Sequence, residues 1–121
     1  MAAPLVELTD PASVDRAARA LFGSRIDTRP AVSHSFAAWK AEPDSPLTTI
    51  KINEHGPKSD LDFLALHIAR ARADAIIITG KILRDEPALT FDLRADPRWD
   101  DALVQWRKRR WGLLVPPWLL F

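Results

Sequence analysis

The chain has 121 residues, a formal net charge of +1 and no cysteine. This length suits a single domain with one modest core, and the near-zero charge gives no general attraction to nucleic acid or to anionic membranes. The absence of cysteine excludes disulfides, thiolate metal sites and cysteine nucleophiles. Neither a secretory signal nor an apolar run of the roughly 20 residues needed to cross a membrane is recognisable, so we expect a cytoplasmic protein.

The first element is predicted to be an amphipathic helix. Asp10 supplies an amino-terminal cap, Pro11 suits the first helical position, and Gly23 supplies a stop. Apolar residues recur on one face at helical spacing: Val14, Ala17, Ala18, Leu21 and Phe22.

Two strands are expected next, separated by a polar, proline-rich loop. Residues 29–39 and the β-branched residues 47–53 are predicted strands, residues 40–46 a loop, and residues 54–58 a turn.

A second helix is predicted to begin after Ser59, with Asp62 completing a short capping box, and to end at Asp74. Its inner face is expected to carry Leu61, Leu64, Ala65, Ile68 and either Ala71 or Arg72. The uninterrupted apolar run 75–78 follows. Such a run between helices is typical of a strand covered on both faces.

The remaining sequence predicts short elements and a third helix. Residues 81–85 are expected to form one helical turn before Pro87, and residues 90–93 a brief strand. Asp96 and Pro97 repeat the helix-start signal of the first helix. The apolar face then contains Trp99, Ala102, Leu103 and Trp106. This order of strands and helices indicates an α/β domain with some parallel pairing.

Residues 70–86 contain the strongest candidate site. Thr79 and Gly80 at a strand end allow backbone N–H groups to approach an anion, and Lys81 can add a positive charge. Arg70 and Arg72 diverge by about 200° around a helix, so only one can face a given ligand while the other stays in solvent. The pair Asp85–Glu86 can accept hydrogen bonds from ribose or amide groups. The alternative is an ordinary solvated helix face followed by a turn and an exposed bend.

The run ARARADAIIITGKILRDEPALT resembles the reductase domain of the bacterial riboflavin-biosynthesis deaminase-reductase. The matching residues are Arg70, Arg72, Asp74, Ala75, Gly80, Asp85, Pro87, Leu89 and Thr90. The resemblance implies a dihydrofolate-reductase-like fold, with a mixed, mainly parallel sheet and flanking helices. It also implies NADPH as cofactor and a pyrimidine ribotide, 5-amino-6-(5-phosphoribosylamino)uracil, as substrate.

By this resemblance, Arg72 and Leu89 contact the substrate. Asp85 lies on the cofactor side, together with the turn formed by Thr79, Gly80 and Lys81. The chain departs from the family at Lys81, where the family has a threonine that touches NADPH, and its turn is one residue shorter.

A further departure lies just after Thr90, where the family has a basic residue and this chain has Asp92. Arg94 is the nearby residue that can substitute for it in substrate binding. No catalytic side chain is identified, because the nicotinamide itself carries the reactivity in hydride transfer.

The chain is shorter than the family's reductase domain and contains no glycine-rich loop of the kind that grips cofactor phosphates. We therefore expect one partial domain over residues 1–121, resembling the amino-terminal half of the family fold, with a helical segment at 1–28. Standalone activity is doubtful on this interpretation. The alternative is a non-catalytic α/β interaction or oligomerisation protein that uses an exposed sheet edge.

The tail at residues 107–121 is basic, then tryptophan-rich and apolar, and it supports several interpretations, because basic residues beside tryptophans also suit a membrane interface or an RNA backbone. Arg107–Arg110 can be the cationic end of a helix, followed by a core strand. Alternatively, the segment can bind a membrane surface peripherally. No metal is expected, because no histidine stands at ligand spacing to another. The three histidines are His34, His55 and His67.

Overall fold

The computed structural model describes all of the chain except residues 1–6, 29–31, 33–37, 50–59 and 95. The elements are α1 (Pro11–Phe22), the 3-10 helix η1 (Gly23–Asp27), β1 (Ala38–Trp39), β2 (Thr48–Thr49), α2 (Asp60–Arg72), β3 (Ala75–Ile77), α3 (Gly80–Asp85), α4 (Asp100–Trp111) and β4 (Trp118–Leu120). The predicted α/β class is confirmed at this level: helices dominate, and the chain contains a small parallel sheet.

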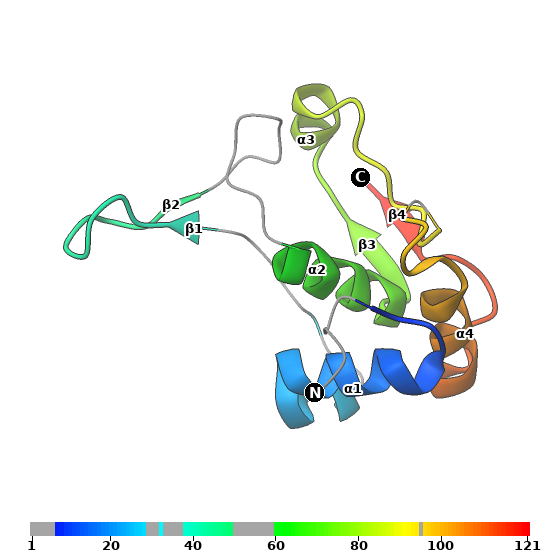
Figure 1. Cartoon of the computed structure of the whole chain (residues 1–121). Helices are drawn as coiled ribbons and strands as arrows, with labels where there is room; N and C mark the ends of the chain where they lie inside the picture. The colour runs from blue at the N-terminus through cyan, green and yellow to red at the C-terminus, as the bar shows by residue number, and fades with distance from the viewer. Residues whose placement is uncertain (1–6, 29–31, 33–37, 50–59, 95) are drawn as a thin grey trace.

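Helices α1, α2 and α4 pack on one another and enclose the core (Figure 1). Each contributes the apolar face that its periodicity predicts, since burying that stripe is what stabilises an amphipathic helix. The buried apolar residues are Leu8, Val14, Ala17, Ala18, Ile26, Leu64, Ile68, Ala71, Leu93, Trp99, Ala102, Leu103 and Trp106. On α2, the predicted inner-face residue Leu61 is instead exposed.

The ends of α1 lie where local chemistry predicts. The Asp10 carboxylate accepts a hydrogen bond from the backbone N–H of Ser13 at 2.8 Å, and Pro11 occupies the first turn. Gly23 ends the helix with φ of +62°, a conformation that glycine adopts without steric cost. The predicted first helix is confirmed.

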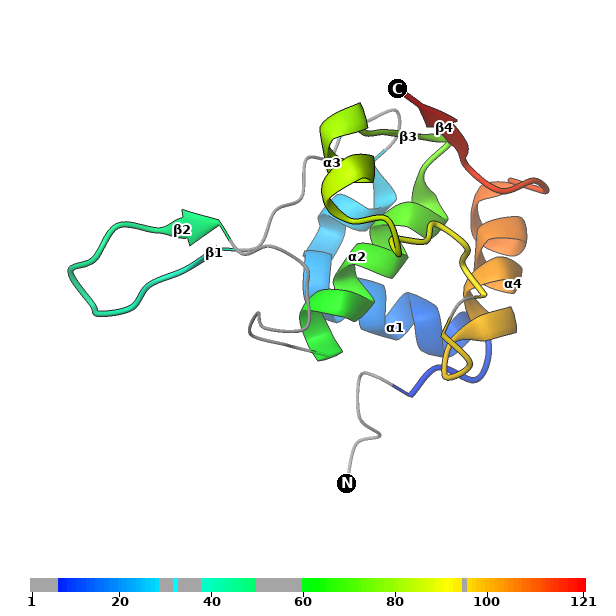
Figure 2. The same cartoon turned by 90° about the horizontal axis from the view of Figure 1, so that it is seen from above.

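The strands form two separate pairs. β1 and β2 are antiparallel, with Ala38 opposite Thr49, and their hairpin projects away from the helices in both views (Figures 1 and 2). β3 and β4 are parallel and joined through α3 and α4. The loop 40–46 is confirmed. Several predictions lie outside the described residues: most of the two strands at 29–39 and 47–53, the turn at 54–58 and the Ser59 cap.

The expectation that both faces of 75–78 are covered is wrong. Ile77 is 77% exposed and only Ile78 is buried. The tail forms strand β4, but all three of its residues are exposed, so it is not a core strand. The apolar runs at 75–78 and in the tail do form strands, but their burial depends on what packs against them.

The predicted strand at 90–93 is also wrong, because side chains take the backbone N–H groups that a strand would use. The Asp92 N–H donates to Thr90 Oγ1 at 3.2 Å, and the Arg94 N–H donates to Asp92 Oδ1 at 2.9 Å. Similarly, Asp96 accepts from the Arg98 N–H at 2.9 Å in a turn. Helix α4 therefore begins at Asp100 rather than after Asp96.

Candidate functional site

The turn Thr79–Lys81 follows the carboxyl end of β3, as predicted. Thr79 caps α3 by accepting the Ile82 N–H at Oγ1, 3.4 Å away, and Gly80 is the first helical residue. Lys81 forms an ion pair with Asp85 along α3, with the Lys81 side chain 70% exposed. The structure therefore places all four predicted cofactor-side residues on one short, solvent-facing segment, where Lys81 and Asp85 neutralise each other.

Arg70 and Arg72 point in different directions, as their spacing predicts, but neither stays in solvent. Arg70 is 8% exposed. Its guanidinium donates to the carbonyl of Thr90 at 3.1 Å and lies 4.7 Å from the ring centroid of Phe91. Burial lowers the pKa of Arg70 from its ordinary value, although an arginine at this site remains cationic.

Arg72 reaches the other side of the helix layer. It donates to the carbonyl of Thr28, and its guanidinium lies 5.5 Å from the ring centroid of Trp111. Arg70, rather than the substrate-binding candidate Arg72, is therefore the arginine that the structure brings to the segment after Leu89. The sequence does not indicate that Arg70 contacts this segment, because both residues are arginines on the same helix and no local signal distinguishes them.

The other two substrate-side candidates lie on the segment that follows α3. Leu89 is half-buried, and its N–H donates to the Glu86 carbonyl at 3.0 Å in a turn. Arg94 is largely exposed and lies 3.9 Å from Asp101, a weak surface pair. Arg70 contacts this segment through its hydrogen bond to the carbonyl of Thr90, the residue after Leu89.

His67 is a buried residue whose environment the sequence did not reveal. It is 2% exposed, with its ring 4.3 Å from that of Phe63 and 5.1 Å from that of Trp99, centroid to centroid. Its Nδ1 lies 2.9 Å from the Phe63 carbonyl oxygen, which places the proton of the neutral ring on Nδ1. Burial lowers the pKa of His67. Among the described residues no group of three or more His, Asp or Glu side chains is arranged to hold a metal ion.

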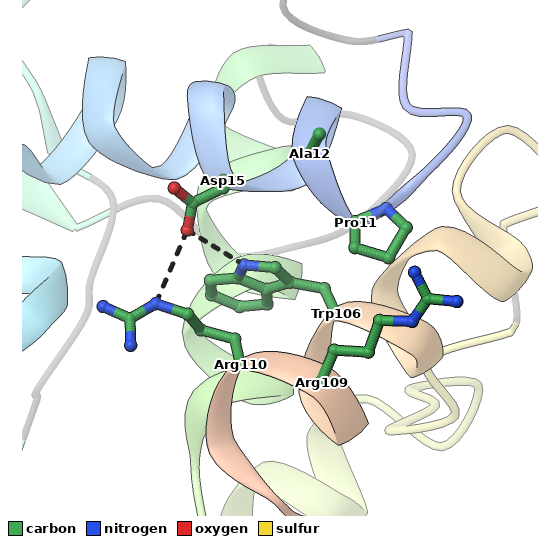
Figure 3. Close-up of a pocket in the computed structure, with 6 residues that line it drawn as sticks. All are labelled: Pro11, Ala12, Asp15, Trp106, Arg109 and Arg110. Carbon is green, nitrogen blue, oxygen red and sulfur yellow. Dashed lines mark hydrogen bonds and ion pairs between the residues drawn. The ribbon is translucent and has the colours of Figure 1, made fainter.

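A groove of about 320 Å³ lies between α1 and α4 (Figure 3). It is lined by Pro11, Ala12, Asp15, Trp106, Arg109 and Arg110. Asp15 accepts from Trp106 Nε1 at 3.3 Å and pairs with Arg110 at 3.7 Å. Trp106 is only 1% exposed. The groove is thus a shallow surface feature whose central groups already bind one another and hold α1 against α4.

The basic cluster at 107–110 divides into different roles. Arg107 is buried and donates to the carbonyls of Val115 and Ala71 at 2.8 and 2.9 Å, and also to that of Ala73. Arg110 pairs with Asp27. Lys108 and Arg109 are exposed. The interpretation of the cluster as the carboxyl end of a helix is confirmed: Arg107 is buried, whereas Arg110 is exposed and pairs with Asp27 at the surface.

A scan against protein-family models, a search of curated proteins and a search of solved structures each returned no match. In the part of the chain that the structure describes, every helix is too short or too polar to span a membrane.

Proposed function

We propose that this chain is an NADPH-dependent reductase-type protein that acts on a pyrimidine ribotide, with its ligand site at the carboxyl end of β3. The observation that carries the proposal is the run from Arg70 to Thr90. Its residues resemble those of the riboflavin-pathway reductases, in which a helix leads into a strand and then a turn, and helix α2, strand β3 and the turn at Thr79–Lys81 follow one another here.

The parallel pairing of β3 with β4 supports a dihydrofolate-reductase-like arrangement. Ile76 is opposite Leu119, and the connection between the two strands passes through α3 and α4. In sheets built from such crossovers, ligands bind beyond the carboxyl ends of the strands. Thr79, Gly80 and Lys81 occupy that position after β3.

On this proposal the protein positions its ligands and the nicotinamide supplies the hydride. Lys81 and the backbone N–H groups near Gly80 would face the cofactor phosphates, with Asp85 accepting a hydrogen bond from ribose. Leu89 and Arg94 would contact the substrate, whereas Arg72, whose guanidinium binds the Thr28 carbonyl, is not part of this proposed site. Arg70 would act as a positioning residue, because it holds the Thr90 carbonyl beside Leu89.

Titrating the protein with NADPH while recording its melting temperature tests the proposal. A ligand that binds only the native state at about 100 times its Kd stabilises that state by about 2.7 kcal/mol. Lys81→Ala should reduce the NADPH-induced shift without lowering the melting temperature of the free protein, because the Lys81–Asp85 pair is exposed. Lys108→Ala, which removes an exposed cation from α4, is the matched control. The proposal fails if millimolar NADPH produces no shift, or if both variants respond like the wild type.

A further inference from the structure

The carboxyl-terminal residues 113–121 lie beside β3 without entering the helical core (Figures 1 and 2). None of them belongs to the buried apolar cluster. Strand β4 pairs with β3 in a two-stranded sheet, and a parallel pair of this size is marginally stable by itself. We name residues 113–121 the strap. Its exposed large apolar side chains are Leu114, Val115, Trp118, Leu119, Leu120 and Phe121.

Backbone hydrogen bonds hold the strap against β3. The Trp118 N–H donates to the Asp74 carbonyl at 3.0 Å, and the Ile78 N–H donates to the Leu120 carbonyl at 3.0 Å. These two bonds lie at opposite ends of the pairing. Because the strap buries little apolar surface, its attachment depends on such bonds more than on packing.

Arg107 joins the strap to the helices. Its Nε donates to the Val115 carbonyl at 2.8 Å, while its Nη1 donates to the carbonyls of Ala71 and Ala73 at the end of α2. The bond to Val115 has a charged donor that is only 3% exposed, so it is stronger than a bond between neutral groups. Release of the strap breaks this bond and leaves the two bonds to α2 in place.

The backbone of the strap suits movement as one unit. Gly112 ends α4 with φ of +66°, a conformation that glycine can leave and adopt again without steric cost. Pro116 and Pro117 stand directly before β4, and their fixed φ makes this stretch stiffer than an ordinary tail. A stiff segment that follows a permissive residue pivots rather than frays.

We propose that the strap opens and closes as a unit over an intact helical core, with Gly112 as its hinge and Arg107 as its latch. Local opening occurs in the parts of a fold that bury few apolar groups. Opening removes the acceptor of the Ile78 N–H, one residue before the turn Thr79–Lys81. The closed strap therefore fixes the start of that turn and controls the ligand site. This control rests on the proposed function, whereas the opening itself does not.

Native-state hydrogen exchange of the full chain, followed by NMR without cofactor, tests the opening. The reporters are the amides of Trp118 and Ile78. We expect their protection factors to agree within about 3-fold and to lie at least about 100-fold below that of Leu103, which is buried in α4. Equal protection distinguishes opening as a unit from fraying, in which Ile78, bonded nearer the chain end, exchanges first.

Two variants test the latch and the stiffness of the strap. Arg107→Met should lower the protection of both reporters at least about 10-fold, because it removes the charged donor to Val115. Arg109→Met, at an exposed cation two positions away, is the control and should leave them unchanged. Pro116→Gly should lower their protection by about 2- to 5-fold, because it increases the entropy of the open strap. This variant keeps every contact of Arg107, so it tests the strap even where Arg107→Met does not fold.

Reporter amides as protected as Leu103 overturn the proposal, because the strap would then open only with the whole protein. A difference above about 10-fold between Trp118 and Ile78 overturns opening as a unit. Protection that is unchanged in both Arg107→Met and Pro116→Gly overturns the assigned latch and hinge. Since no cofactor is present in this experiment, failure of NADPH to bind would affect only the proposed function.

Discussion

Replacing Arg107 with methionine tests how the carboxyl-terminal segment is attached to the helices. The Arg107 guanidinium binds the carbonyls of Ala71 and Ala73 at the end of α2 and that of Val115 before β4. Methionine keeps much of the apolar stem while removing all of these donors. The three carbonyls then lose a charged partner in a site where Arg107 is only 3% exposed.

Each hydrogen bond to a charged group contributes about 1.5–3 kcal/mol to the free energy of unfolding. Methionine also removes the cost of burying the guanidinium charge, and this gain offsets part of the loss. We therefore expect Arg107→Met to lower the free energy of unfolding by about 3 kcal/mol. Urea denaturation followed by circular dichroism measures this value. Arg109→Met, two positions away and exposed, should change it by less than about 0.5 kcal/mol. Equal effects of the two substitutions would refute the assigned role of Arg107.

Two further predictions concern pH and backbone conformation. Burial lowers the pKa of His67 in the folded state. The contribution of neutral His67 to the free energy of unfolding is therefore complete above its unfolded pKa of about 6.5. This contribution is lost as the pH falls from that value through the folded pKa, because the unfolded state binds the proton first. Urea midpoints at several pH values should therefore fall more steeply below pH 6.5 in the wild type than in His67→Gln, and equal slopes would contradict the assignment. Gly112→Ala should cost about 1–2 kcal/mol in the same assay, because Gly112 ends α4 with φ of +66°. Gly80→Ala, where an added Cβ meets only the flexible end of Arg84 at 3.3 Å, is the control, and a similar loss there would contradict the explanation.

Much of the helical layer could be predicted from sequence, because the signals that define it are local. The cap at Asp10, the stop at Gly23 and the apolar faces each act within a few residues. The turn after Asp96 shows the limit of such signals, because an aspartate–proline pair also suits a turn in which the carboxylate accepts a nearby N–H.

The burial of residues far apart in sequence could not be predicted in the same way. The apolar run at 75–78 resembles a buried strand whether or not other elements cover it. Arginine is usually an exposed residue, so the sequence gives no reason to expect that Arg70 and Arg107 are buried. Each is buried because backbone carbonyls from distant segments accept hydrogen bonds from its guanidinium. The candidate turn at Thr79–Lys81 was predictable because a strand end and a helix cap define it locally.

The most direct test of the proposed function is an NMR titration of the isotope-labelled protein with NADPH, following the backbone amides. The proposal predicts progressive shifts of the amides of Thr79, Gly80, Lys81 and Asp85, with smaller changes at Leu89. Unchanged amides across residues 79–85 at millimolar NADPH, or changes confined to the groove between α1 and α4, would contradict it.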